Sequence, residues 1–334
     1  MRYYSINISN PTTGKPVLPS SLGGLPISSL LPSGGHNPAA LNIEFDIPQK
    51  TYFAPEQDAW LRIWGLSLKD LSASFNLNGS NVMISAGMSK GLPLANPAQQ
   101  GLILKGMVYQ AFGNWVGVDQ TVDMNFAPQT GTPSSELNFP FSWKAGTPLS
   151  TAISQTLATG MPNFTQKIKI NPNLVIGYDE SGFYQSLQQF NDYLNARSKS
   201  LIKGGTYLGI TISTRGTEVS VTDGSVKAED SDVISIAFQD MIGQATWVDT
   251  HTIAAKLVLR GDLTIGSTIK LPPGPVQTTI ASNSGFSPFQ NPAQRANFSG
   301  KFVVKHIHHY GNFRQADAAS WNTTIEAYTD GVVS

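Results

Sequence analysis

Residues 41–47 read Leu-Asn-Ile-Glu-Phe-Asp-Ile, a strict alternation of apolar and polar side chains. Because successive side chains of a strand point to opposite faces, this pattern predicts a strand with one buried and one exposed face. Residues 59–64 repeat the alternation, with Trp60 and Trp64 on the face opposite the apolar side chains. The two stretches together predict antiparallel β structure.

The same period recurs along most of the chain. Further strands are predicted at residues 4–9, 81–86, 102–112, 121–126, 208–212, 219–221, 234–238, 253–259, 263–271, 301–310 and 321–328. Turns rich in Gly, Asn and Pro separate them, which is typical of an antiparallel barrel or sandwich. Residues 66–72 are predicted to form one short helix between these strands.

The period changes in the middle of the chain. A helix is predicted from Pro148, with Thr147 as its N-cap, to a stop at Gly160. A second helix is predicted from near Ser181, because apolar residues follow Phe183 at spacings of four, three and four. We therefore expect a small helical element between two β regions.

The predicted fold class is mainly β, with two antiparallel β-barrel domains that flank a short helical segment. The expected domains are an N-terminal strand and Pro/Gly/Ser-rich arm at 1–40, a first barrel at 41–135, a helical insert at 136–204, and a second barrel at 205–334 with a long loop at 272–300. The arm at 10–38 has no periodicity. It is either a flexible segment or a strap that orders only against a neighbouring subunit. Leu25 and Leu30 favour the strap, since solvent would leave such side chains uncovered.

Composition excludes several classes of function. The 334-residue chain has 22 Lys plus Arg and 22 Asp plus Glu, and its charged fraction is only 13%. A nucleic-acid binder or a membrane-surface protein needs a basic excess, and none is present. The absence of cysteine excludes disulfides and thiolate chemistry. No apolar run reaches the ~18 residues of a membrane span, and MRYYSINISN lacks the apolar region of a secretory signal, so we expect a soluble protein made in a cytoplasm, without membrane insertion.

No standard catalytic motif is present, so we predict no catalytic or cofactor-binding residue, no cofactor and no enzymatic activity. His306 and His308 share one face of a predicted strand, a spacing that two metal ligands can have. Such histidines are more often polar-face residues, and no metal site is predicted. The acidic run at 229–232 is read as a solvated turn. Trp60 and Trp64 could line a sugar groove, although a barrel core or subunit contact suits them better.

Two segments of the β regions resemble a known family. The first joins VMISAG at 82–87, a strand that ends in Ala-Gly, to a strand at 102–111 with a Lys-Gly kink. The second runs from the Ile-Gly turn at 241–244 through a long strand into LTIGS at 263–267. Both patterns are similar to those of phage tail baseplate hub proteins, the central hub family of contractile tails, which is related to the hub part of type VI secretion spike proteins.

The C-terminal segment 300–328 is the third element of the resemblance. It contains a Val-rich strand at 303–304, a turn at Gly311 and the Trp-x-Thr pattern of Trp321 and Thr323. The order and spacing of all three segments carry the resemblance. The 10–38 arm and the 272–300 loop have no counterpart in the family.

The resemblance implies a structural role in the virion, at the tail baseplate, after assembly in a host cytoplasm. It implies a homotrimeric ring whose six similar barrels join a sixfold tail tube to a threefold central spike. The implied partners are the tail tube protein ring, the spike and other baseplate proteins, with DNA passing through the lumen without specific binding. The candidate structural and interface residues are Trp60, Trp64, Leu25, Leu30 and Trp321. The alternatives are a receptor-binding or glycan-binding tail protein and a tail-associated cell-wall hydrolase.

Overall fold

A computed structural model describes residues 1–49, 59–89, 99–128, 138–202, 207, 209–215, 218–225, 233–249, 252–272, 298 and 300–329. The predictions that concern residue 208, the acidic run at 229–232 and nearly all of the 272–300 loop lie outside these residues. The described elements are mostly strands in large antiparallel sheets, so the mainly β prediction is confirmed. None of the helices in the described ranges is long and apolar enough to cross a membrane.

The elements follow the chain in this order. The strands of the first β region are β1 (Arg2–Ser9), β2 (Ile27–Ser28), β3 (Ile43–Gln49), β4 (Trp60–Trp64), β5 (Asn81–Met88), β6 (Gly101–Val116) and β7 (Asp119–Pro128), with α1 (Leu68–Ser72), η1 (Ser20–Leu22) and η2 (Ser74–Leu77). The middle unit has β8 (Phe139–Trp143), α2 (Leu149–Gly160), β9 (Thr165–Lys169), β10 (Glu180–Tyr184), α3 (Leu187–Leu201), β11 (Thr211–Arg215) and β12 (Glu218–Thr222). The second β region has β13 (Ile234–Ser235), η4 (Phe238–Asp240), β14 (Thr246–Trp247), β15 (Thr252–Val258), β16 (Thr268–Lys270), β17 (Lys301–Asn312), η5 (Ala318–Ser320) and β18 (Trp321–Thr329).

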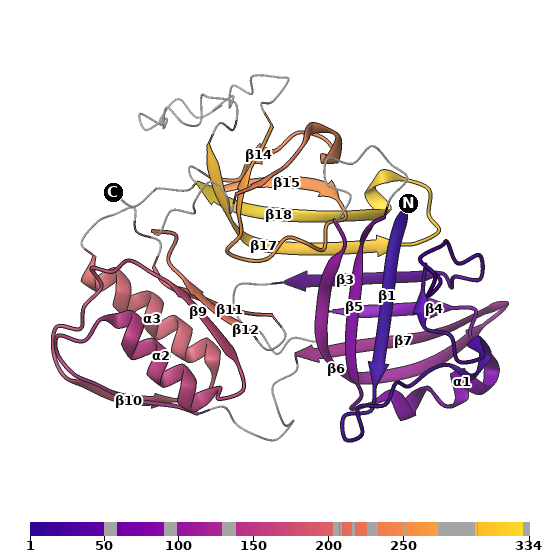
Figure 1. Cartoon of the computed structure of the whole chain (residues 1–334), viewed down its shortest axis with the longest axis horizontal. Helices are drawn as coiled ribbons and strands as arrows, with labels where there is room; N and C mark the ends of the chain where they lie inside the picture. Colours follow the sequence, from indigo (N-terminus) through magenta and orange to yellow (C-terminus); the bar gives the residue numbers. More distant parts are fainter. Residues whose placement is uncertain are drawn as a thin grey trace.

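Both β regions belong to one sheet. Its order is β14-β15-β18-β17-β3-β4-β7-β6-β5-β1-β2, with β16 also paired to β17 and β13 paired to β16. The long strand β17 joins the regions, because it pairs with β18 along most of its length and with β3 over residues 307–312 (Figure 1). The two β regions are therefore joined by backbone hydrogen bonds, not by a linker alone.

Side chains bridge the gap where the first β region curls back on itself. The Tyr4 hydroxyl donates to the carbonyl of Leu41 at 2.7 Å, just before β3. The Arg2 guanidinium donates to the carbonyls of Asn312 and Asp317, each at 2.7 Å, at the turn between β17 and β18. No strand ladder closes either β region into a barrel among the described strands. The predicted barrel closure is thus replaced, in the first region, by hydrogen bonds from side chains.

The chain has three hydrophobic cores in its described part. The first lies within residues 4–126 and also takes in Leu259 and Trp321 from the second β region. The third core lies within residues 236–327. The middle core lies within residues 139–221 and is larger than the predicted insert, because β11 and β12 belong to it. β12 pairs in parallel with β9 of the same unit, which removes both strands from the second β region.

The short helix predicted at 66–72 is α1, and both helices predicted in the middle of the chain exist, with different starts. Pro148, not Thr147, is the N-cap of α2. α3 begins at Leu187, where the Ser186 side chain accepts a hydrogen bond from the backbone nitrogen of Gln189. The expected start at Ser181 is wrong because residues 180–184 form β10, which pairs with β8. The Phe183 side chain on that strand is exposed, so its helical spacing was coincidental.

The 10–38 arm packs on its own chain. Both predictions for it are wrong, because it is neither a flexible segment nor a strap that needs a neighbouring subunit to become ordered. The backbone nitrogen of Val17 donates to the carbonyl of Ile8, and β2 pairs with β1. Val17 and Leu22 pack against the first core. The arm is ordered by these contacts without a neighbouring subunit. Residues 10–38 are called the strap below, a name that implies no contact with another subunit.

Candidate functional site

Trp321 connects the two β regions. Its strand pairs with β15 and β17, but its ring lies in the core of the first region with only 2% of its surface exposed. The ring meets Phe45 edge to face at 5.3 Å between centroids, and the indole nitrogen donates to the carbonyl of Gly87 at 3.0 Å. A buried aromatic side chain with its N–H satisfied contributes mainly to packing. Trp321 therefore acts here as a structural residue between the regions.

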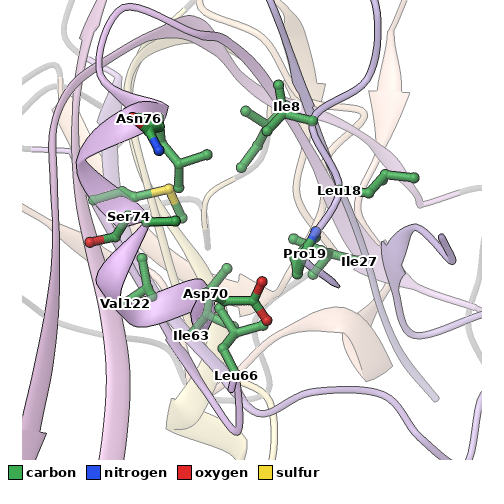
Figure 2. Close-up of a pocket in the computed structure, with 14 residues that line it drawn as sticks. Ile8, Leu18, Pro19, Ile27, Ile63, Leu66, Asp70, Ser74, Asn76 and Val122 are labelled. Carbon is green, nitrogen blue, oxygen red and sulfur yellow. The ribbon is translucent and has the colours of Figure 1, made fainter. Parts of the chain in front are cut away.

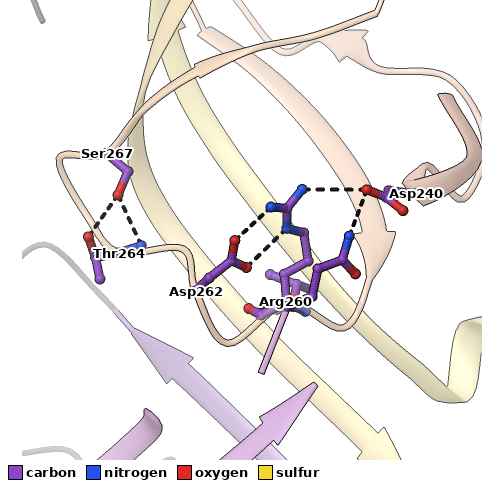
Figure 3. Close-up of polar contacts among 7 residues, drawn as sticks. Asp240, Arg260, Asp262, Thr264 and Ser267 are labelled. Atoms are coloured by element: carbon purple, nitrogen blue, oxygen red, sulfur yellow. Dashed lines mark hydrogen bonds and ion pairs between the residues drawn. The ribbon is translucent and has the colours of Figure 1, made fainter. Parts of the chain in front are cut away.

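A buried polar cluster lies at the same junction (Figure 3). The Arg260 side chain is 1% exposed and donates two hydrogen bonds to Asp262, at 3.0 and 2.6 Å. Its Nη1 lies 3.6 Å from the Asp240 carboxylate, which accepts a hydrogen bond from Gln99 at 2.7 Å. Gln99 lies two residues before the start of β6, so the cluster ties the first region to the second. Buried charges of this kind are tolerated only when paired, which makes their geometry specific.

Trp60 and Trp64 lie on the outward face of β4, as their alternation predicts, and both are half-buried. Arg62 lies between them, with its guanidinium carbon 6.0 Å from the Trp60 ring centroid and 5.7 Å from that of Trp64. Arg62 is also paired with Asp123 of β7 at 2.5 Å. The guanidinium thus covers a face of each ring, where a stacked sugar would otherwise bind.

His306 and His308 do not share a ligand cluster. The Nδ1 atom of His306 lies 3.0 Å from Glu326 of β18, and the Nε2 atom of His308 lies 2.5 Å from Asp46 of β3. Each imidazole therefore pairs with a different carboxylate on a different strand. Within the described ranges, no three His, Asp or Glu side chains are grouped to hold a metal ion.

The strap carries the two leucines that were singled out from the sequence. Leu25 is exposed, and Leu30 is partly buried beside an isolated β-bridge to His36. Near its middle, the strap is held by Asp70 of α1, whose carboxylate accepts hydrogen bonds from the backbone nitrogens of Ser20 and Ser21. Although burial opposes it, these bonds and those from serine hydroxyls hold the pKa of Asp70 well below its usual range.

A cavity lies between the strap, α1 and the inner face of the sheet (Figure 2). Its volume is about 180 Å³, and apolar side chains make most of its wall. Ile63, Val122 and Met124 form part of its buried floor. Leu18 and Ala73 are exposed and lie at its mouth. The sequence alone did not predict this cavity, since its walls come from five separate segments.

The tip of the β6–β7 hairpin is an exposed apolar surface. Trp115, Val116 and Val118 are 63%, 75% and 96% exposed. Gly117 makes the turn with a positive φ of 61°, a conformation that favours glycine. Sequence reasoning missed this tip, although the run Trp-Val-Gly-Val-Asp at 115–119 contains the turn signal between apolar residues.

No protein-family model matches the chain, and no curated protein sequence matches it. Solved structures of phage tail and type VI secretion proteins do match it. The 43 kDa tail protein of prophage MuSo2 from Shewanella oneidensis is 7% identical with a TM-score of 0.49, over 100% of both chains. The tail protein from Neisseria meningitidis MC58 is 9% identical with a TM-score of 0.47, over 99% of this chain and 97% of that one.

A third match is the Escherichia coli c3393 protein, described as a component of the type VI secretion system with structural similarity to the T4 bacteriophage tail proteins gp27 and gp5. It is 8% identical with a TM-score of 0.43, over 86% of this chain and 73% of that one. All three likenesses have TM-scores below 0.5.

Proposed function

We propose that this chain is a structural subunit of a phage tail baseplate hub. In this proposal three copies form a ring that joins a sixfold tail tube to a threefold central spike. The observation that carries it is the ladder between β17 and β3, which joins two antiparallel β regions of one chain into a single sheet. Three chains with two β regions each present six β units around an axis, as a threefold-to-sixfold adaptor requires.

An adaptor of this kind needs a fixed angle between its two β regions, because six units must meet a regular tube. The ladder, the buried ring of Trp321 and the cluster around Arg260 all cross the junction. A buried ion pair adds little net stability, and in some proteins it fixes one specific geometry. These contacts support the proposal that the two regions move as one body.

The proposed partners are a tail tube protein ring, a central spike protein and other baseplate proteins. The chain has a formal net charge of zero and a charged fraction of 13%, which suits extensive protein contact and gives no net positive charge to attract DNA. We propose that DNA passes through the lumen of the ring without specific binding. The proposed location is the tail baseplate of a virion, and the proposed role is not enzymatic.

Antibody labelling tests the role. Gold-labelled antibodies against this chain should mark the end of the tail far from the capsid in electron micrographs of particles that contain it. Labelling along the tail tube or on the capsid would contradict a hub. In parallel, peptidoglycan zymography of the purified chain should show no clearing. Clearing that one Asp or Glu substitution abolishes would favour a cell-wall hydrolase, and glycan binding that depends on Trp60 would favour a receptor-binding protein.

A further inference from the structure

The β6–β7 hairpin ends in an apolar tip that its own chain does not cover. β5 pairs with β6 only as far as Met107, and β4 pairs with β7 only from Thr121 onward. At the end of the ribbon, residues 115–116 therefore pair only with residues 119–120. A two-stranded ribbon with an apolar end has little stability in water and is typical of a contact site. Val118 at its turn is almost fully exposed.

The cavity under the strap matches the hairpin tip in size and in its apolar character. Protein cores pack densely and contain few voids larger than a water molecule. A cavity of about 180 Å³ exceeds that limit, and apolar cavities of about 150 Å³ bind single apolar groups such as benzene. Figure 2 shows the Leu18 side chain at the mouth, directed away from the other labelled side chains. The cavity is thus large enough to take one apolar side chain.

We propose that the hairpin tip of one copy inserts Val118 into the strap cavity of a second copy. This inference rests on the proposed homotrimer, and it names the two surfaces that join neighbouring copies. The contact is heterologous, because a tip meets a cavity and not another tip. Heterologous contacts close into rings when the rotation between copies permits it.

The hairpin tip cannot fill the cavity of its own chain. Val122 and Met124 of β7 line the floor of that cavity, while the same strand continues outward to the tip. An extended ribbon held by backbone hydrogen bonds does not fold back over four residues. A hairpin tip that fills the cavity must therefore come from another copy.

The charges near the tip favour a protein partner over a lipid surface. Asp119 begins β7 directly after the turn, and residues 106–128 contain no Lys or Arg. Segments that enter a membrane surface carry Lys or Arg around their apolar residues, and carboxylates there are unfavourable. A second copy fits because the chain has no net charge and so does not repel itself. One chain also contains both the apolar tip and a cavity of suitable size.

Two variants and two matched controls test the contact by sedimentation velocity. Val118→Asp charges the tip, and Ala73→Trp blocks the mouth of the cavity. Both positions are exposed, so both variants should fold. We expect each variant to raise the dissociation constant of the assembly at least tenfold.

Two control variants carry the same new side chains at exposed positions elsewhere. Val248→Asp and Ala158→Trp should assemble like the wild type. If Ala73→Trp loses the wild-type circular dichroism spectrum, Asn76→Trp at the same mouth replaces it.

Mixing the two variants gives the sharper result. The tip variant keeps an intact cavity and the mouth variant keeps an intact tip, so an equimolar mixture should form a one-to-one dimer although each variant alone is monomeric. A Val118→Asp variant that assembles as tightly as the wild type overturns this inference and leaves the proposed ring standing. A mixture that stays monomeric also overturns it. A wild-type chain that is itself monomeric overturns both the ring and the tip-to-cavity contact.

Discussion

The backbones of Gly101 and Gly261 are in direct contact at the junction of the two β regions. A Cβ atom on Gly101 would lie 2.0 Å from the carbonyl oxygen of Gly261, and one on Gly261 would lie 2.5 Å from the nitrogen of Gly101. No side chain fits in this space. The start of β6 and the segment after β15 are therefore held together at a distance that only glycine allows at both positions.

Because of this contact, one added methyl group at Gly101 should lower the stability of the fold. Gly101→Ala should lower the free energy of unfolding by about 1–3 kcal/mol or more, because backbone atoms cannot move aside as a flexible side chain can. Urea unfolding followed by circular dichroism measures the loss. Gly177→Ala is the control, since a Cβ there meets nothing within 4 Å and its φ is not positive. Equal stability of the two variants would show that the junction is looser than described.

Trp321→Ala should destabilise the fold by about 3–5 kcal/mol, the usual effect of truncating a fully buried aromatic side chain. Trp321→Phe keeps a ring against Phe45 but loses the hydrogen bond to Gly87, so it should lie between the wild type and the alanine variant. Thermal melting ranks the three proteins. Unchanged melting with a lost partner contact would mean that Trp321 acts at a surface.

In the Arg260 cluster, a second substitution should restore part of the stability that a first one removes. Arg260→Met leaves two carboxylates without their buried cation and should cost about 3–5 kcal/mol. The double variant Arg260→Met/Asp240→Leu removes the fully buried carboxylate as well, and it should recover part of that loss because apolar pairs often replace buried ion pairs without penalty. Denaturant unfolding of both variants checks this. A double variant that is less stable than the single one would contradict it.

The hydrogen bonds between Asp70 and the strap should contribute to the free energy of unfolding in a pH-dependent way. Its folded-state pKa lies below the unfolded value of about 3.9. The hydrogen bonds to Asp70 therefore add stability above about pH 4, and this contribution is lost as the pH falls through the folded-state pKa. Asp70→Asn should cost about 1–2 kcal/mol at pH 7 and less at pH 3. A difference between variant and wild type that does not shrink at pH 3 would contradict this account of the strap.

The sequence predicts the strands far better than it predicts how they join. Tyr4, Ile6 and Ile8 alternate on β1, and the alternation on β3 and β4 is reproduced in their burial. That success follows from the two-residue period, which is a local property. Barrel closure is not local. Whether Arg2 reaches the carbonyl of Asn312 depends on residues 310 positions apart, and no window along the chain contains both.

The candidate surfaces were predictable to different degrees. The outward position of Trp60 and Trp64 follows from alternation alone. The assignment of β11 and β12 to the middle core does not, because their apolar period is the same in any sheet, and only the parallel pairing with β9 decides it. The order of the strap was not predictable, because it comes from pairing with β1 and from contacts with residues such as Asp70, which lies some fifty residues further along the chain.

The number of copies in the native assembly decides whether this chain can join a threefold spike to a sixfold tube. Electron microscopy of the purified wild-type chain, viewed along the assembly axis, should show three copies around an open channel, with six similar lobes facing one side. We expect the β17–β3 junction to set the angle between the two lobes of each copy. A chain that stays monomeric at high concentration, or a ring of any other copy number, would contradict the hub proposal.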